Sequence, residues 1–203
     1  IIPRNNKTRG EIAYDAVDFL RECVGEKKIL GCGVQMMPCF GKFEYMRIGA
    51  DMALSWKHSL LRKMMHREDV STPNAIRNSI YRRSLNKRAF LCDPDVFLLR
   101  DNNIKFNKEQ KKFLAKFIKI FGSVIFTSDD VSSYDSHQKR IFENTLFDNA
   151  KLVSVDEIDN IVTVVYEEDE DIRRFAFNVE TGETIALRNV LPSSEDIEEK
   201  PKV

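Results

Sequence analysis

Residues 1–150 of this chain are predicted to form an α/β fold with a parallel sheet, and a small antiparallel β unit is predicted to follow. Strand-like segments alternate with amphipathic helices over residues 1–150, and each strand ends in small or polar residues. That alternation is typical of βα units, whose strands run parallel. A complete eight-stranded barrel needs roughly 250 residues, so the sequence predicts a partial (β/α)8 TIM barrel, about half of one.

Helix signals in the first part are of two kinds, apolar residues at helical spacing and capping residues at the expected ends. Gly25 and Gly122 follow two of the apolar stripes, and Pro73 and Asn107 suit the starts of two helices. Four helices are therefore predicted, over residues 8–24, from Pro73 past Tyr81, from Asn107 to Phe121, and over 137–148.

Strand signals are short apolar runs bounded by glycine, proline or acidic residues. The first four runs are predicted to be parallel strands, at residues 28–34, 43–49, 90–92 and 123–127. The later runs are predicted to be antiparallel, at residues 152–155, 161–166, 172–177 and 184–187. The sequence thus divides into a half-barrel over 1–150, a small antiparallel β-domain over 151–192 and a polar tail over 193–203.

Composition excludes several classes of function. The chain is 42% hydrophobic with 14 Phe, enough for a sizeable core, and its 32 Lys+Arg balance 32 Asp+Glu. Zero net charge argues against a general nucleic-acid or anionic-membrane binder. The four cysteines form no CxxC pair and there are only three histidines, so we expect no metal site.

The beginning of the chain carries a further expectation. The N-terminus has neither the layout of a signal peptide nor an initiator methionine, and no apolar run of the chain is long enough to cross a bilayer. We expect a cytoplasmic protein with free thiols that makes no membrane contact, and a natural protein longer than this sequence.

The segment Phe43 to Asp51 carries the candidate chemistry. It reads as a buried strand that runs into Gly49, with Arg47 and Asp51 four residues apart around that glycine. Barrel enzymes place their catalytic groups where the strands end. A cation and a carboxylate held together there can bind a polar substrate and move a proton, and they can also form a plain structural ion pair.

Four strand-end segments together resemble one family of enzymes. They read Leu30-Gly31-Cys32-Gly33, Met46-Arg47-Ile48-Gly49-Ala50-Asp51, Cys92-Asp93-Pro94-Asp95 and Thr127-Ser128-Asp129-Asp130, with the helix from Asn74 to Arg82 between the second and the third. Their order and separations resemble the α-galactosidases of glycoside hydrolase family 36. The resemblance implies that residues 1–150 are the last four βα units of the barrel, and that the trailing strands are the C-terminal β-domain.

The family's site residues map onto a few positions of this chain. The resemblance implies that Asp51 is the general acid/base of a retaining α-galactosidase, that Arg47 contacts the sugar and that Cys32 lines the galactose pocket. The family's nucleophile, an aspartate in a lysine-x-aspartate context, has no match in this chain. The resemblance therefore implies a fragment of a longer enzyme that hydrolyses terminal α-galactosides, inactive when isolated and without a cofactor.

Other residues are weaker candidates with structural alternatives. Trp56 can stack on the apolar face of a sugar. Asp93 and Asp95 flank a proline, as in ordinary turns, and can organise the site. Asp129 and Asp130 can support the site or cap the last helix, and Cys32 can be a small buried residue.

The sequence leaves an alternative function open and carries an expectation about assembly. In place of an enzyme fragment, the chain can be a non-catalytic half-barrel that binds a saccharide or a protein partner. A half-barrel leaves sheet edges and apolar surface uncovered, which favours association. We therefore expect the isolated chain to self-associate, and its other partner to be a galactoside or another small saccharide.

Overall fold

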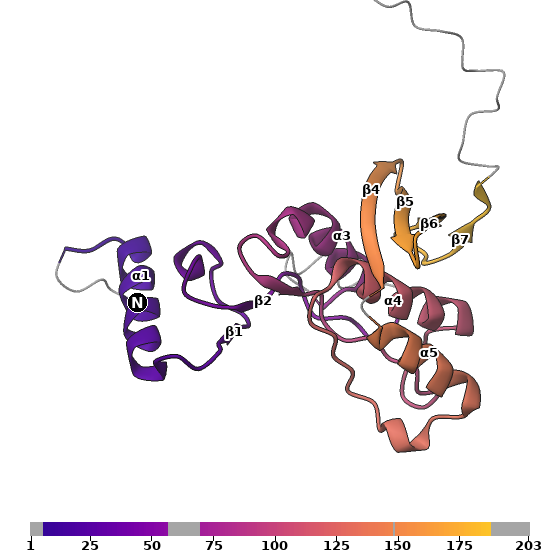
Figure 1. Ribbon diagram of the computed structural model, residues 1–203, viewed down its shortest axis with the longest axis horizontal. Coiled ribbons are helices and arrows are strands. Elements are labelled where there is room, and N and C mark those ends of the chain that lie inside the picture. Colours follow the sequence, from indigo (N-terminus) through magenta and orange to yellow (C-terminus); the bar gives the residue numbers. More distant parts are fainter. Residues whose placement is uncertain (1–5, 57–69, 148, 188–203) are drawn as a thin grey trace, which may run out of the picture.

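The computed structural model describes residues 6–56, 70–147 and 149–187, and these form an elongated molecule (Figure 1). Helix α1 lies at one end, a small parallel sheet and α3 follow, and two further helices lie with an antiparallel sheet at the other end. The helices are α1 (Arg9–Val24), α3 (Thr72–Arg82), α4 (Lys108–Phe121) and α5 (Ser136–Leu146). The strands are β1 (Leu30–Gly31), β2 (Tyr45–Arg47), β3 (Leu91–Asp93), β4 (Ala150–Ile158), β5 (Ile161–Glu168), β6 (Asp171–Asn178) and β7 (Thr184–Ile185).

The α/β class with a parallel sheet and then an antiparallel sheet is confirmed. The parallel strands follow the order β1-β2-β3, with Tyr45 paired to both Leu30 and Leu91. Strands β1 and β2 are shorter than predicted, because only the residues that find a partner on the adjacent strand enter the ladder, and β3 is shifted by one residue. The predicted strand over 123–127 is wrong as a strand: Val96 and Phe126 form a single parallel bridge there.

Local side-chain bonds explain where the helices begin. Thr8 and Glu11 form a reciprocal capping box before α1, and Asn107 and Gln110 form another before α4. Asp135 caps α5 in the same way, with Gln138 as its partner. Each box satisfies backbone donors that an uncapped helix leaves free.

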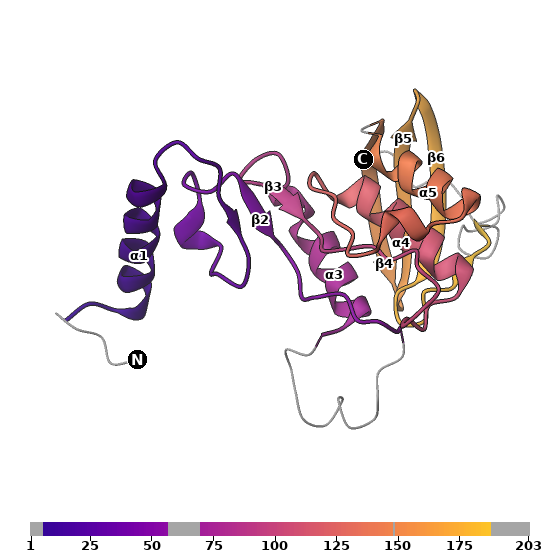
Figure 2. The same cartoon turned by 90° about the horizontal axis from the view of Figure 1, so that it is seen from below.

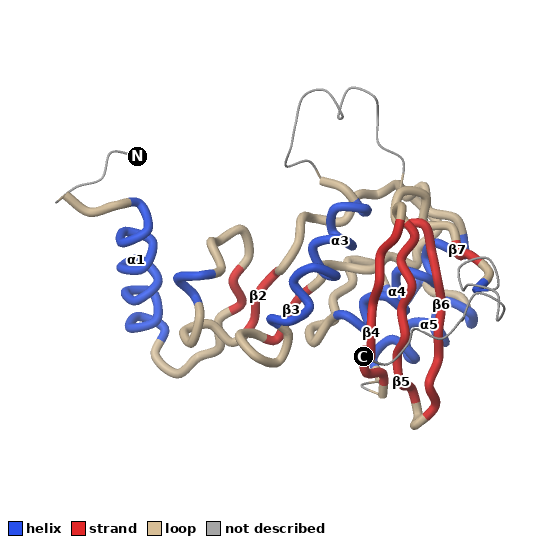
Figure 3. The backbone as a smooth tube through the Cα atoms, turned by 90° about the horizontal axis from the view of Figure 1, so that it is seen from above, coloured by secondary structure: helices blue, strands red, loops and turns tan. Residues whose placement is uncertain are grey.

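The four antiparallel strands follow the order β4-β5-β6-β7 (Figure 3). Two-residue turns join β4 to β5 and β5 to β6, and all four turn residues have positive φ: Asp159, Asn160, Asp169 and Glu170. Such turns match the twist of paired strands, and Asn and Asp tolerate this backbone well. Strands β4, β5 and β6 extend beyond the predicted ranges because acidic residues at their ends, such as Glu157 and Glu168, stay in the ladder. Strand β7 ends at Ile185, two residues before the predicted end.

Helix α4 joins the antiparallel sheet to the rest of the molecule through one hydrophobic core. Phe113 and Phe117 of α4 pack against Phe177 of β6, and the ring centroids of Phe113 and Phe177 lie 4.3 Å apart. Figure 2 shows α4 and α5 together on one face of this sheet. The core continues to Ile76 of α3 and Phe97 after β3, so the antiparallel unit shares its interior with part of the preceding α/β region.

A smaller core stabilises the region near α1. Val17 is the one α1 residue in it, with Phe43, Met46 and Ile48 from the β2 segment. Ion pairs support this packing, Arg21 with Glu44 at 3.0 Å and Lys42 with Asp18. Within the described ranges, no helix is both long and apolar enough to cross a membrane.

Candidate active site

Arg47, the last residue of β2, contacts three carboxylates. Its Nε donates to Asp93 Oδ2 at 2.7 Å, which is possible because the parallel register places Arg47 opposite Asp93 at the end of β3. Its Nη1 lies 2.7 Å from Asp95 Oδ1 and 3.1 Å from Asp51 Oδ1. Carboxylates at and just after the ends of β2 and β3 thus pair with one guanidinium group.

The three carboxylates differ in exposure. The side chain of Asp93 is fully buried and that of Asp95 nearly so, whereas the Asp51 side chain is 67% exposed. Asp95 also accepts a hydrogen bond from the Met52 amide, and its own amide donates to Asp93 Oδ1 at 2.8 Å. Asp93 and Asp95 therefore hold Arg47 and the backbone after Asp51, while Asp51 itself faces solvent.

Burial and charge act in opposite directions on this cluster. Burial by itself would lower the pKa of Arg47, but the hydrogen bond and charge of Asp93, with the charge of Asp95, raise that pKa. Burial raises the pKa of Asp95, although the Met52 amide and Arg47 oppose the shift. Arg47 therefore stays charged, and two nearly buried carboxyl groups lie against it.

A cavity of about 690 Å³ opens beside Arg47. The structure brings three predicted site residues, Cys32, Arg47 and Asp51, to its wall. The wall also contains Gly33, Gly49, Ala50, Val70, Asn74, Arg77, Asn78, Tyr81 and Arg82. The space suits a small polar molecule, since ligand sites commonly enclose roughly 300–1,000 Å³.

The cavity wall formed by α3 was not foreseen as part of the site. Asn74, Arg77, Asn78 and Tyr81 recur at helical spacing on the side of α3 that lines the cavity. Arg77 also lies 2.6 Å from Glu180, beyond β6, so α3 is tied to the antiparallel unit. The regular spacing of these polar side chains is the signal in the sequence that could have revealed this wall.

Trp56 requires a correction, because the structure places it in the core and not at the cavity. It is only 4% exposed, and its Nε1 donates to the Val179 carbonyl at 2.9 Å. Its ring packs against Phe106 and Phe113. An indole enclosed in this way has no free face on which a sugar could stack, so we do not retain its substrate-binding role.

Asp129 and Asp130 organise loops and do not line the Arg47 cavity. The buried carboxylate of Asp129 accepts from the Leu99 amide at 2.6 Å and from the Tyr134 hydroxyl at 2.7 Å. Asp130 caps the short turn Val131–Ser133 through the Ser132 amide, and the hydrogen bonds from Ser132 lower its pKa. These hydrogen bonds give both aspartates a structural role.

The described part of the chain offers no metal centre. In residues 6–56, 70–147 and 149–187, no three His, Cys, Asp or Glu side chains gather in an arrangement that could hold a metal ion. The aspartates near β3 surround the Arg47 guanidinium instead.

Comparisons with known proteins place this geometry in a wider setting. No protein-family model matches the chain. Among solved structures, the α-galactosidase TtGalA of Thermus thermophilus, bound to p-nitrophenyl α-D-galactopyranoside, matches with TM-score 0.62 and 22% identity over 78% of this chain. The chain has an α-galactosidase-like fold. The resemblance predicted from the strand-end motifs is confirmed at this level.

Two further solved structures that match this chain are also α-galactosidases. TtGalA in complex with stachyose gives TM-score 0.57 and 25% identity over 66% of this α-galactosidase-like chain, which spans 29% of that structure. α-Galactosidase I of Mortierella vinacea gives 0.56 and 12% over 81%, and the chain spans 49% of it. The first match covers 32% of TtGalA. The chain thus spans between about a third and a half of the enzymes that it resembles.

Proposed function

We propose that this chain is the part of a retaining α-galactosidase that supplies the general acid/base, Asp51, together with the sugar contacts Arg47 and Cys32. One observation carries the proposal. Of the three carboxylates around Arg47, Asp51 alone is exposed, and it stands at a cavity beside the ends of parallel strands. Strand ends of this kind are where barrel enzymes place catalytic groups.

The reaction assigns Asp51 two proton transfers. In the first step its carboxyl protonates the glycosidic oxygen of the departing group. In the second step its carboxylate removes a proton from the water that releases galactose. Arg47 orients Asp51 through the contact at 3.1 Å, while Asp93 and Asp95 offset the positive charge of the guanidinium.

The nucleophile comes from polypeptide outside this chain. Retaining hydrolysis needs a second carboxylate roughly 5–5.5 Å from the acid/base. The candidates beside Arg47, Asp93 and Asp95, are buried and ion-paired, so neither is free to attack a sugar. The partial coverage of the α-galactosidase structures supports the same view. We therefore expect the 203-residue chain alone to be inactive.

The substrate class is a terminal α-galactoside. Asn74 and Asn78 stand on the α3 wall of the cavity, and their amides can donate to and accept from sugar hydroxyls. Arg47 adds a charged donor to the cavity wall, and Cys32 adds a small side chain. Since Arg47 and Arg77 of this wall are already paired with carboxylates, the combination suits a neutral, hydroxyl-rich ring.

Hydrolysis of p-nitrophenyl α-galactoside by the longest natural form of the protein tests this function. We expect turnover in the wild type and a loss of about 10²–10⁴-fold in Asp51→Asn, because the amide cannot exchange the catalytic proton. Asp130→Asn is the matched control, since that aspartate caps a turn away from the cavity, and it should keep its activity. Full activity in Asp51→Asn would overturn the proposal.

Saccharide binding without hydrolysis is the second candidate. Within the described residues, Asp51 is the one carboxylate of the Arg47 cluster that stays exposed. This favours binding without hydrolysis, because the cluster supplies no second free carboxylate to act as the nucleophile. If galactose binds to the longest natural form and Arg47→Met weakens that binding, while no galactoside is hydrolysed, the binding module is the correct function.

A further inference from the structure

A second cavity, of about 440 Å³, lies between α4 and α5 and reaches β5 and β6. The two helices run together on one face of the antiparallel sheet (Figure 2). Facing turns of each helix supply most of the wall: Lys112, Ala115, Lys116 and Lys119 from α4, and His137, Arg140, Ile141, Asn144 and Thr145 from α5. Tyr166, Glu168 and Arg173 complete the lining, and we call this space the α4–α5 groove.

The α4–α5 groove is strongly cationic. Five lysine and arginine side chains and one histidine line it, against a single carboxylate, that of Glu168. The chain as a whole has equal numbers of acidic and basic residues, so the surplus is local. Like charges gathered in a hollow repel one another, and an anion bound there relieves that repulsion.

Glu168 is already fully used by two of these cations. Its Oε1 lies 2.7 Å from Lys119 Nζ and its Oε2 lies 2.6 Å from Arg173 Nη1. The Lys119 side chain is only 5% exposed, and its ammonium also donates to Asn144 Oδ1 at 2.7 Å. An ammonium has three donors, so in the described part of the chain one remains for a ligand.

The other cations have no carboxylate partner among the described residues. Lys116 Nζ lies 4.7 Å from the ring centroid of Tyr166 and 4.5 Å from that of Phe175, which holds its charge beside β5 and β6. Arg140 uses its Nε on the Ser136 carbonyl at 3.3 Å, which leaves the Nη groups free for a ligand. Lys112 stands one turn before Lys116 on the same wall.

We propose that the α4–α5 groove binds a small molecule that carries a phosphate group. Phosphate is compact, doubly charged and rich in acceptors, so it can take hydrogen bonds from an arginine and several lysines at once. The volume suits a small ligand and is far too small for a nucleic-acid duplex. The inference is independent of the proposed galactosidase function, because it concerns a different cavity.

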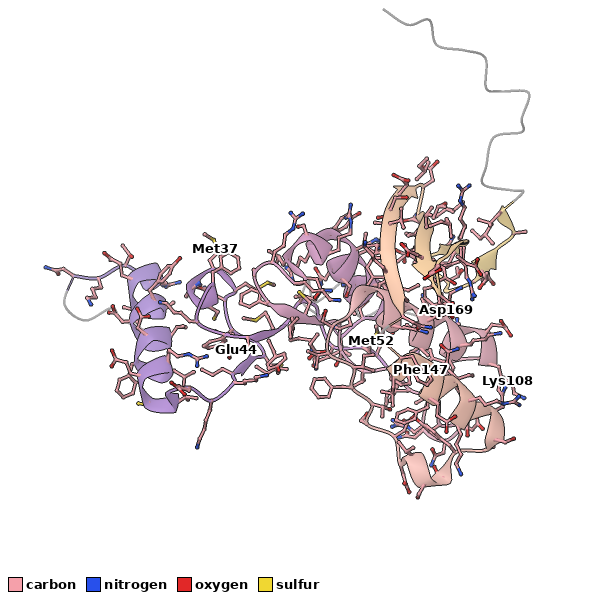
Figure 4. All side chains as sticks on the ribbon, in the orientation of Figure 1. Met37, Glu44, Met52, Lys108, Phe147 and Asp169 are labelled. Atoms are coloured by element: carbon pink, nitrogen blue, oxygen red, sulfur yellow. The ribbon has the colours of Figure 1, made fainter. Side chains whose placement is uncertain are left out.

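Calorimetric titration of the 203-residue chain with inorganic pyrophosphate at low ionic strength tests the proposal. We expect saturable binding at one site, weakened about tenfold or more in Lys116→Gln and in Arg140→Gln, because each loses a charge-assisted hydrogen bond. The control is Lys108→Gln, at the start of α4 and outside the groove (Figure 4), which should change the affinity less than about twofold.

Two further titrations identify the source of the phosphate. Orthophosphate and galactose 1-phosphate distinguish recognition of the phosphate alone from recognition of a sugar phosphate. Absence of saturable heat with all three anions would overturn the proposal. Equal weakening by Lys108→Gln would overturn it too, since it would show general attraction to a basic surface. Circular dichroism of each variant verifies that the fold is retained.

Discussion

Asp95 determines how Asp51 is held, although it lies on another strand end. It pairs with Arg47 at 2.7 Å and accepts the amide hydrogen of Met52, the residue after Asp51. Its φ of +86° is unusual for a residue with a side chain, and the surrounding contacts have to maintain it. We therefore regard Asp95 as a positioning residue for the proposed acid/base.

Replacement of Asp95 by Ala should destabilise the chain by about 1–3 kcal/mol, because it leaves the buried Met52 amide without its acceptor. Urea unfolding followed by circular dichroism measures this loss. Asp130→Ala, in an exposed cap, is the control and should lose less. Equal stability of Asp95→Ala and wild type would show that this hydrogen bond contributes nothing.

The pH dependence of stability should also report on Asp95. Burial raises its pKa above the ordinary value, so the folded chain binds this proton more tightly than the unfolded chain does. Its contribution is therefore greatest at or below the ordinary pKa of aspartate, and it declines as the pH rises through the raised value. In urea titrations from about pH 4 to pH 7, the stability difference between wild type and Asp95→Asn should shrink as the pH rises. A constant or growing difference would contradict this.

At the residue scale, the sequence predicted which side chains stand at strand ends but not their partners. Arg47 and Asp93 are 46 residues apart, and their contact depends on the register of β2 against β3. The sugar-stacking role predicted for Trp56 was wrong for the same reason, since its partner Val179 lies 123 residues further along the chain. Local patterns carry no information on such pairs.

At the scale of elements, the contact of the Thr181–Gly182 turn with Trp56 joins the antiparallel unit to the rest. A Cβ added at Gly182 would lie 2.6 Å from ring atoms of Trp56, and the residue has φ of +70°. Neither the space nor the backbone suits a larger residue. This turn therefore packs closely against Trp56 and holds the antiparallel unit against the preceding α/β region.

Gly182→Ala should destabilise the chain by about 2–3 kcal/mol, from overpacking against Trp56 added to backbone strain. Gly41→Ala is the matched control, because Gly41 has φ of +72° and nothing within 4 Å of the added carbon. Thermal unfolding followed by tryptophan fluorescence compares the two variants. An equal loss of stability in both variants would show that the backbone strain accounts for all of it, and that the Trp56 ring moves aside at no measurable cost.

Elements with strong local signals were predicted best. The bounds of α1 and α4 lie within a residue or two of the prediction, because capping residues and apolar stripes coincide there. The lengths of β1 and β2 were overestimated, since apolar runs continue beyond the residues that are paired in the ladder. The shared core of α4 and β6 was not foreseen, because it depends on how two amphipathic faces meet.

On the scale of the whole molecule, the end near α1 has apolar surface without cover. Tyr14, Phe19 and Leu20 of α1 are exposed, Phe19 to 67%. Strand β1 pairs with β2, and the described residues offer no strand to its other edge. Unpaired edges and apolar patches favour association.

We expect the isolated chain to self-associate through this end at tens of micromolar. Light scattering should then give a mass well above the 23.6 kDa of one chain, and Phe19→Glu should restore the monomer. The control is Phe147→Glu, which lies away from α1 in the part that holds α4 and α5 (Figure 4), where Phe147 is 64% exposed. A monomeric wild type would contradict this expectation.

The most direct test of the central claim is a comparison of leaving groups in Asp51→Ala, in the longest natural form of the protein. A general acid matters most when the departing oxygen is a poor leaving group, as in melibiose, and least when it is a dinitrophenolate. We predict that Asp51→Ala loses at least about tenfold more kcat/KM on melibiose than on 2,4-dinitrophenyl α-galactoside. An equal loss on both substrates would contradict the role of Asp51 as general acid.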